Sequence, residues 1–298
     1  VCIGSALALE YIISRVGSRK ILDGRRASPF EMLLPTGAFY AVVLLGVNLV
    51  SIIALLIWSI TRTWRFPHFF PSSFSISNWT MSFGQLLGPF WVSGLAALLS
   101  CVLAIIIVIG CFENEQKLAR TRIASISQRS LWIVYLPLLI PQISFLFGIQ
   151  VLLVFFHFEG TWAALIWIHL VFVLPYVFLT LANAYRSYDQ RYSYVGKTLC
   201  GGSLHTFFRI KLIILAKPIL FSMAVGFGVS IAQYLPTLYV GAGRFATITT
   251  ETVSLASGSD RRIMAVYALI QLLLALTAYL TAIALPAMMF RKRQAMKN

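Results

Sequence analysis

Residues 86–110, LLGPFWVSGLAALLSCVLAIIIVIG, form an apolar run that contains no charged side chain. An α-helix of roughly 20 apolar residues is long enough to cross the hydrocarbon core of a bilayer. The whole chain has the same character, because 59% of its 298 residues are hydrophobic and 11% are charged, with a mean hydropathy of +0.85. A soluble domain has about a quarter of its residues charged. The sequence therefore predicts an all-α membrane protein.

The apolar segments and the basic residues between them predict the topology. Nineteen Lys and Arg residues lie in 14–33, 111–130, 184–217 and 291–298, and five lie in the opposite loops. Because cytoplasmic loops carry the excess of Lys and Arg, we expect the first set to be cytoplasmic. The net charge of +15 is then an orientation signal, and nucleic acid is not expected as a partner. The six predicted spans are 34–60, 86–110, 131–156, 161–183, 218–240 and 263–290.

The start of the chain predicts how the protein is organised. Its first apolar run is followed by Arg15, Arg19 and Lys20, whereas a signal peptide has its basic residues before the apolar run. We therefore expect an earlier transmembrane helix to end here, so that the chain is part of a longer membrane protein. The predicted parts are a helix end at 1–13, a basic cytoplasmic linker at 14–33, a six-span domain at 34–290 and a cytoplasmic tail at 291–298.

The spans lack charged residues in their central parts, which bears on how transport would be driven. No Asp, Glu, Lys or Arg lies there. Such residues cost about 2.5–3.5 kcal/mol to insert and usually serve proton or ion relays. A proton-coupled carrier is therefore disfavoured, although a Na⁺ site built from carbonyl groups stays open. An ion-coupled transporter or channel, and an assembly subunit without transport, remain alternatives to an ATP-driven transporter.

The residue types that perform chemistry do not form a site in this sequence. The four histidines do not have metal-ligand spacing, and the four cysteines do not form a CxxC pair. No pair of carboxylates lies in a span, so acid–base hydrolysis within the membrane has no candidate residues. We predict no catalytic residue, metal or cofactor on this chain, and we expect His169 in the fourth span to be a packed histidine.

Residues 196–198, Gly-Lys-Thr, have the sequence that ends a phosphate-binding loop. That loop also requires a glycine five residues before Gly196, where this chain has Arg191. Nucleotide binding at this segment is therefore excluded.

Residues 189–217 instead predict an amphipathic helical hairpin on the cytoplasmic side. Asp189 can cap a helix whose apolar residues, Tyr192, Val195 and Leu199, recur at spacings of three and four. A Gly-Gly pair ends that helix, and Ser203 can cap the next one. The exposed apolar residues suit a protein partner. A hairpin lying in the headgroup region, held by Arg191, Arg209 and Lys211, is equally compatible with these residues.

Two longer stretches resemble the permease subunits of binding-protein-dependent ABC importers of the type I fold. HLVFVLPYVFLTLANAY, 169–185, is similar to the fourth span of that family, and DQRYSYVGKTLCGGSLHTFFRIKL, 189–212, aligns with its cytoplasmic Glu-Ala-Ala loop. Asp189 matches the acidic residue before the loop. The sequence departs from the motif, because Tyr194, Val195 and Gly196 occupy the Glu-Ala-Ala positions and Cys200 occupies the glycine position, followed by Gly201. The apolar positions are matched by Leu199, Phe207, Ile210 and Leu212.

Three further stretches extend the resemblance over residues 34–290, one complete permease unit. They are LPLLIPQISFLFGIQVLL (136–153), SIAQYLPTLYVGAG (230–243) and LASGSDRRIMAVYALI (255–270). Fused double permeases for ferric iron or thiamine look nearest, and sulfate permeases are also similar. The resemblance implies that residues 34–290 are a six-helix permease unit in the bacterial inner membrane. This unit would be the C-terminal half of a fused double permease.

The resemblance also implies partners and functional residues. The partners are a cytoplasmic ABC ATPase dimer that binds the ATP, a periplasmic solute-binding protein and a second permease half. The hairpin would be the coupling helix that docks on the ATPase. Its candidate coupling residues are Asp189, Tyr194, Val195, Gly196, Leu199, Cys200, Gly201 and Phe207. Candidate residues of the substrate pathway are Gln142, Gln150, Gln233 and Tyr234, which lie on the spans that the family uses for its central cavity; hydrogen bonding between helices is the alternative.

Overall fold

The computed structural model describes residues 33–64, 71–118, 133–200, 202–258 and 260–289, with the backbone alone for 33–38 and 200. The predicted segments at 1–13 and 291–298, nearly all of the linker at 14–33, most of the loop at 111–130, and Gly201 lie outside the described residues. The chain divides into two units, residues 1–57 and 58–298, and each is considered by itself.

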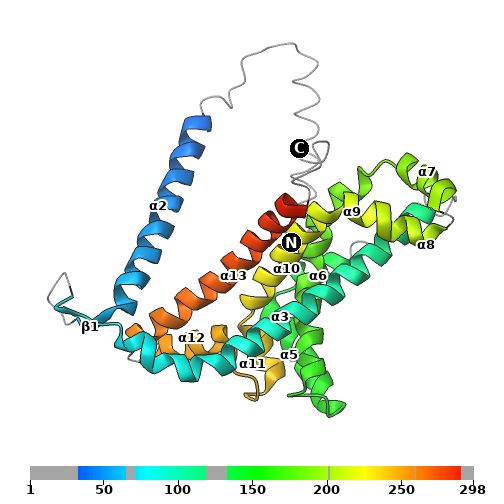
Figure 1. Ribbon diagram of the computed structural model, residues 1–298. Helices are drawn as coiled ribbons and strands as arrows, with labels where there is room; N and C mark the ends of the chain where they lie inside the picture. The colour runs from blue at the N-terminus through cyan, green and yellow to red at the C-terminus, as the bar shows by residue number, and fades with distance from the viewer. Residues whose placement is uncertain (1–32, 65–70, 119–132, 201, 259, 290–298) are drawn as a thin grey trace. The chain divides into compact units, whose positions relative to one another are not determined.

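The prediction of an all-α membrane protein is confirmed (Figure 1). Four described helices are long and apolar enough to cross a membrane, and up to six spans result if two bent helix pairs each count as one. Apart from the helices, β1 (Thr61–Thr63) and β2 (Ser73–Phe74) form a short antiparallel ribbon. The helices are α2 (Leu33–Ser59), α3 (Ser77–Leu118), α5 (Gln142–Phe155), α6 (Trp162–Arg186), α7 (Arg191–Cys200), α8 (Ser203–Thr206), π-helical η2 (Phe207–Lys211), α9 (Leu212–Ile214), α10 (Ala216–Ile231), α11 (Leu235–Gly241), α12 (Ile248–Ser257) and α13 (Arg261–Met289).

Two of the predicted spans are not single helices. The third is broken at Ile140–Pro141, where the helix at Ile133–Leu139 and α5 meet at 113°. The fifth ends as α10 at Ile231, and α11 begins beside Pro236. Proline lacks the N–H that continues a helix and clashes with the preceding turn, so it starts the new helix in each case. The sequence predicted each of these spans as one continuous segment, whereas the structure has breaks.

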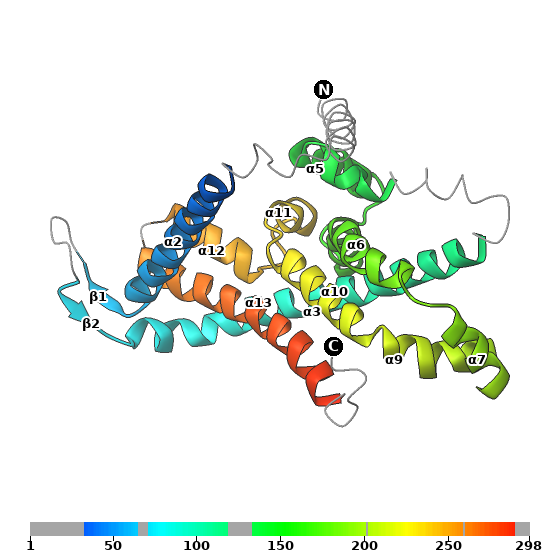
Figure 2. The same ribbon diagram turned by 90° about the horizontal axis from the view of Figure 1, so that it is seen from above.

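The second predicted span is longer than expected. Helix α3 has 42 residues, which at about 1.5 Å per residue exceeds the roughly 30 Å of a bilayer core twofold. Its last two turns carry Glu113, Glu115 and Gln116 to the end of the bundle at which α7 and α8 lie (Figure 2).

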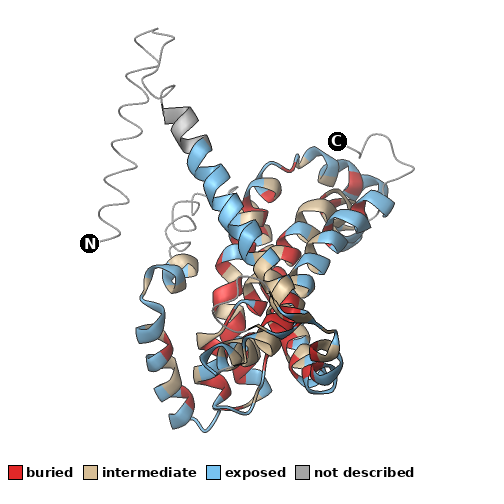
Figure 3. Ribbon diagram, turned by 90° about the vertical axis from the view of Figure 1, so that its left-hand side faces the viewer, coloured by how far each residue is buried: buried red, intermediate tan, exposed pale blue. Residues whose placement is uncertain are grey.

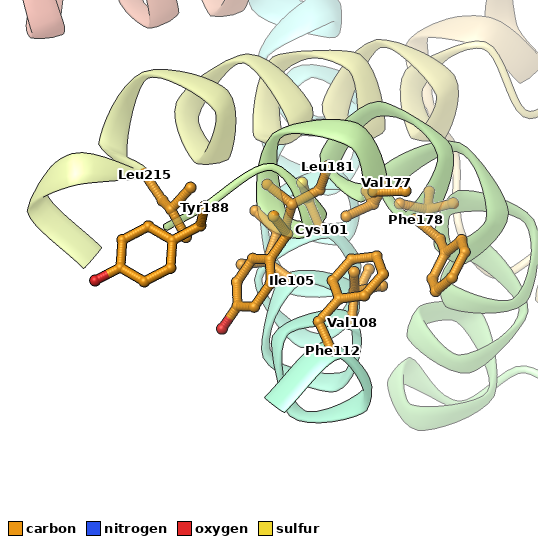
Figure 4. Packing of buried hydrophobic residues seen from close by; sticks show 13 residues of the cluster. Cys101, Ile105, Val108, Phe112, Val177, Phe178, Leu181, Tyr188 and Leu215 are labelled. Carbon is orange, nitrogen blue, oxygen red and sulfur yellow. The ribbon is translucent and has the colours of Figure 1, made fainter. Parts of the chain in front are cut away.

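The main hydrophobic core of residues 58–298 lies where α3, α6 and α10 pack together (Figure 3). Val177, Phe178 and Leu181 of α6 lie against Ile105 and Phe112 of α3, as Figure 4 shows. Helix α10 approaches this pair closely at a glycine. A Cβ atom on Gly226 would lie 2.8 Å from Val177 and 3.0 Å from Cys101. The small residues of the fifth span therefore permit close packing.

Candidate functional site

The predicted hairpin is formed by α7 and by the continuous segment α8–η2–α9, which cross at Gly196. A Cβ atom built on Gly196 would lie 2.6 Å from both Thr206 Cγ2 and Ile210 Cδ1. Contacts below about 3 Å are not tolerated in packed interiors, so only glycine allows the two helices to approach this closely. The glycine that superficially suggested a phosphate-binding loop is thus a packing residue within the hairpin.

The helix caps predicted for the hairpin agree only in part with the structure. Asp189 lies one residue before the cap position of α7, which Gln190 occupies, but its carboxylate accepts the backbone N–H of Arg191, the first residue of the helix, at 2.9 Å. The predicted cap at Ser203 is wrong, because Ser203 is already the first residue of α8 and Gly202 occupies the cap position. The Gly202 carbonyl instead accepts the Thr206 N–H at 3.2 Å and the Thr206 hydroxyl at 2.8 Å.

Exposed apolar side chains lie on both helices of the hairpin, and we call this set the hairpin face. On α7 it consists of Tyr192, Val195 and Leu199, and on the following helix of Leu204 and Phe208. Leu199 and Leu204 are 78% and 75% exposed, and Phe208 is 62% exposed. Apolar surface collected on a small protruding element is typical of a docking site. The sequence reasoning missed Leu204 and Phe208, although their spacing of four residues places both on one side of a helix.

The predicted coupling residues occupy three different environments. Tyr194, Val195 and Leu199 are exposed, whereas Gly196 is buried between the two helices. Phe207 is half-buried and lines a small polar cavity of about 110 Å³ at the base of the hairpin. Cys200 is the last residue of α7, and Gly201 lies outside the described residues.

A buried cation fixes the hairpin to the helical bundle. The Lys211 ammonium donates to the Glu113 carboxylate and, at 2.7 Å, to Gln116 Oε1, both on α3. It also lies 4.6 Å from the ring centroid of Tyr185 and 5.2 Å from that of Tyr188. The Tyr185 hydroxyl donates to the same Glu113 carboxylate. We call these five residues the Lys211 anchor.

The Lys211 anchor rules out part of the membrane-surface alternative. In the membrane-surface alternative Lys211 would reach lipid headgroups, but its side chain is 6% exposed and its ammonium binds Glu113 and Gln116. A buried ammonium is tolerated only when it is paired and hydrogen-bonded, and both conditions are met here. The sequence did not reveal this pair, because Lys211 and Glu113 are 98 positions apart.

Neighbouring contacts extend this connection from α3 to α6 and α7. Arg186 binds Glu115 at 3.1 Å, and Gln116 Nε2 donates to the Tyr185 carbonyl at 3.3 Å. The Tyr188 hydroxyl lies 3.0 Å from the Ser193 hydroxyl of α7. Burial, with the nearby Glu113 charge, raises the pKa of Tyr188 against the opposing effect of the Ser193 hydrogen bond, so Tyr188 stays neutral at physiological pH. Hairpin, α3 and α6 are therefore joined by polar bonds.

A cavity of about 680 Å³ lies where the two broken helices meet, and we call it the central cavity. Gln142 lines it from the start of α5, and Gln233 and Tyr234 line it from the break between α10 and α11. Tyr176 of α6 adds a further hydroxyl. No lining residue among those described is charged. Three of the four predicted pathway residues are thus brought together, while Gln150 does not line this cavity.

A buried histidine connects α6 to both sides of the break beside the central cavity. His169 Nδ1 lies 2.7 Å from the Ser230 hydroxyl of α10, and Nε2 lies 3.0 Å from the Thr237 hydroxyl of α11. Thr237 donates its own hydrogen to the Gln233 carbonyl at 2.8 Å, so it accepts from His169, which therefore carries its hydrogen on Nε2. These bonds confirm the prediction that His169 is a packed histidine.

Comparison with known proteins places this architecture. No protein-family model matches the chain. The chain is 41% identical over 157 residues to the inner membrane ABC transporter permease protein YnjC of Escherichia coli (strain K12). The chain is homologous to an ABC transporter permease. The match covers 52% of this chain and 30% of YnjC, so it spans less than a third of that longer relative.

This homology agrees with the architecture of the chain. An all-helical fold with four to six candidate spans is consistent with an ABC permease. Within the described residues no three His, Cys, Asp or Glu side chains gather as metal ligands do. The described residues thus form an exposed apolar hairpin face, an ionic anchor and a cavity lined by uncharged residues.

Proposed function

We propose that this chain is the transmembrane permease component of an ATP-driven importer in the bacterial inner membrane. The observation that carries the proposal is the hairpin face, which is exposed at one end of a segment anchored by buried bonds to α3 and α6. Homology to an ABC transporter permease supports it. The chain performs no chemistry in this proposal, and ATP is bound and hydrolysed by a separate cytoplasmic ATPase dimer.

The Lys211 anchor suggests how movement of the ATPase would reach the spans. A force on the hairpin face would pass through Lys211 to Glu113 and Gln116 of α3. Tyr185 and Tyr188 would carry it to α6 and the start of α7. Packed elements transmit displacement because their interiors are dense and barely compressible. The hairpin is thus a lever with its fixed point inside the protein.

The central cavity is the part of this chain that we assign to the solute pathway. Gln142, Gln233 and Tyr234 offer amide and hydroxyl groups at the ends of broken helices, where main-chain groups are also left without helical partners. Broken helices form the substrate sites of many transporters. A periplasmic binding protein would deliver the solute, and a second permease half, fused upstream or separate, would complete the pathway. The greater length of YnjC supports a fused arrangement.

The docking hypothesis is tested by changing the hairpin face alone. We expect Leu199→Asp and Phe208→Asp to prevent co-purification with the ATPase, because a desolvated carboxylate at an apolar interface is costly. The matched control is Thr198→Asp, which adds the same charge at an exposed and already polar position of α7. Membrane insertion should be unchanged in all three variants. Unchanged ATPase association of the Leu199 and Phe208 variants would refute the docking role.

Reconstituted vesicles separate this function from ion-coupled transport. An importer should move solute only when the ATPase, ATP and the binding protein are present. Movement driven by a proton or sodium gradient without ATP would refute the proposal and favour the ion-coupled alternative.

A further inference from the structure

A basic cavity lies at the opposite end of the bundle from the hairpin, and neither the coupling nor the pathway hypothesis uses it. It has a volume of about 620 Å³ and lies between Trp58, strand β1 and the start of α13, all within residues 58–298. Figures 1 and 2 both show β1 beside the start of α13. We call it the Arg–Trp cavity, and its lining residues are Trp58, Arg62, Thr63, Trp64, Gly258, Arg261 and Arg262.

The three arginines of the Arg–Trp cavity differ in how far they are neutralised. Arg262 is paired, because its Nε lies 3.1 Å from Asp260 Oδ1 and its Nη1 donates to the Arg62 carbonyl at 2.5 Å. Arg261 lies over the ring of Trp58, 5.6 Å from its centroid. Within the described ranges no carboxylate lies within 4 Å of the Arg62 or Arg261 guanidinium. Two positive charges therefore line one cavity in which the described residues supply them with no anionic partner.

The arrangement of these groups favours a phosphate ligand. Each guanidinium presents parallel N–H donors that match phosphate oxygens in a bidentate geometry. Arg262 is held in place by Asp260 and by the β1 backbone, so part of the site is fixed before any ligand binds. An arginine that is simply solvated on a loop would not line a cavity and would not have a neighbour held in place as Arg262 is.

The two tryptophans favour a lipid as the source of that phosphate. Trp58 and Trp64 lie 5.0 Å apart between ring centroids, at the end of one candidate span and next to the start of another. Indole rings collect at the depth of the lipid headgroups in membrane proteins. We propose that the Arg–Trp cavity binds the phosphate of an anionic phospholipid headgroup, with Arg62 and Arg261 as its ligands and the indoles against the glycerol and upper acyl region.

Native mass spectrometry of the full-length protein in detergent, titrated with short-chain phosphatidylglycerol, tests this site. Arg62→Gln with Arg261→Gln should weaken lipid binding at least about tenfold, since each basic residue near an anionic headgroup adds about 1 kcal/mol. Arg244→Gln removes the same charge from a neighbouring loop, outside the cavity, and should bind as the unchanged protein does. The pair Arg62→Lys and Arg261→Lys keeps the charge but loses the bidentate fork, and should give intermediate binding.

Further titrations identify the source of the phosphate and the outcomes that overturn the proposal. Phosphatidylcholine should bind much more weakly than phosphatidylglycerol. The melting temperature of the protein should rise more with the lipid than with glycerol 3-phosphate. An equal rise with glycerol 3-phosphate would show that the cavity binds a soluble phosphate, and the lipid proposal would be wrong. Equal lipid binding by the double Gln variant, or equal loss in Arg244→Gln, would overturn the site. If the double Gln variant binds the lipid normally but no longer associates with the binding protein, the Arg–Trp cavity is a protein contact and the lipid proposal is overturned.

Discussion

The hairpin end and the central cavity of this protein use polar residues in opposite ways. At the hairpin end, a buried ammonium binds a carboxylate, an amide and two aromatic rings. In the central cavity the described lining residues are uncharged, and the polar groups belong to amides and hydroxyls. Strong ionic bonds hold a shape against force, whereas neutral groups can release a solute. The difference agrees with our proposal that the first region transmits movement and the second lets a solute pass.

The buried His169 shows that the two regions also differ in how they are held together. The hairpin end depends on charge, while the break beside the cavity is held by hydroxyl and imidazole bonds of ordinary strength. Neutral hydrogen bonds contribute about 1 kcal/mol each, and those to charged groups contribute roughly twice that. Substitutions at the two regions should therefore differ in size, and in whether coupling or solute handling is affected.

The largest effect is expected from Lys211→Met, which leaves the Glu113 carboxylate without its cation. Removing one partner of a buried pair costs about 3 kcal/mol, and the exposed third of Glu113 keeps the value from being larger. Thermal unfolding in detergent measures the loss. ATP hydrolysis by the assembled transporter should continue while solute uptake falls, because the lever has lost its fixed point.

Two further variants show whether the Lys211 effect belongs to the pair. Lys217→Met removes a similar charge from α10, outside the Lys211 anchor, and should cost little. Adding Glu113→Gln to Lys211→Met should recover much of the stability, because no charge is then left unpaired. A double variant that is no more stable than Lys211→Met would contradict the role of the pair.

The next effect concerns the crossing of the two hairpin helices. Gly196→Ala places a methyl group 2.6 Å from Thr206 and Ile210, and such overpacking costs about 1–3 kcal/mol. The helix preference of Ala offsets up to about 1 kcal/mol of this. Gly202→Ala is the control, because nothing lies within 4 Å of its added Cβ and its φ of 176° suits any residue. Equal melting temperatures of the two variants would show that the crossing is loose.

The Gly196 crossing illustrates what the sequence could and could not predict. The sequence predicted α7 and a hydrogen bond from its start to Asp189, because both depend on residues close together in the chain. Span positions followed from the apolar runs for the same reason. The close approach of Gly196 to Ile210 depends on how two helices cross, and the Lys211–Glu113 bond joins distant segments. Contacts of this kind are set by tertiary packing, which no local pattern contains.

The central cavity shows an intermediate case. The sequence identified Gln142, Gln233 and Tyr234 by their spans, but not the breaks at Pro141 and before Pro236 that bring them together. Proline marks where a helix can break, while the surrounding helices decide whether it kinks or ends. The same reasoning included Gln150, which lies two turns further along α5 and outside the cavity.

A smaller effect is expected at the helix break beside the central cavity. His169→Leu removes the bonds to Ser230 and Thr237, but Thr237 keeps the Gln233 carbonyl and Ser230 keeps Ser100 as a partner. The cost should be about 1–2 kcal/mol, at the lower end for buried polar groups that lose a partner. Because α11 carries Thr237 next to Gln233 and Tyr234, the KM for solute uptake should rise more than the maximal rate falls.

The control for His169 is a histidine of the other region. His205→Leu changes an exposed residue of α8 and should alter neither the melting temperature nor the KM for uptake. A KM that stays constant in His169→Leu while stability falls would leave His169 as a packing residue without influence on the cavity.

The smallest effect comes from an exposed ion pair, which sets the scale for the buried one at Lys211. Partial burial raises the pKa of Asp260, but the hydrogen bonds and charge of Arg262, with the backbone N–H groups of Arg262 and Ile263, together hold that pKa below its ordinary value. A carboxyl group whose folded-state pKa is lowered stabilises the protein above its unfolded pKa, and this contribution is lost as the pH falls through the folded value. Asp260→Asn should therefore cost less than about 1 kcal/mol at neutral pH, because both side chains are more than a third exposed. The difference in unfolding free energy between Asp260→Asn and the unchanged protein should disappear below the folded-state pKa of Asp260.

A loss of stability as large at Asp260 as at Lys211 would show that burial does not distinguish the two ion pairs, and that the Lys211 anchor has no special strength.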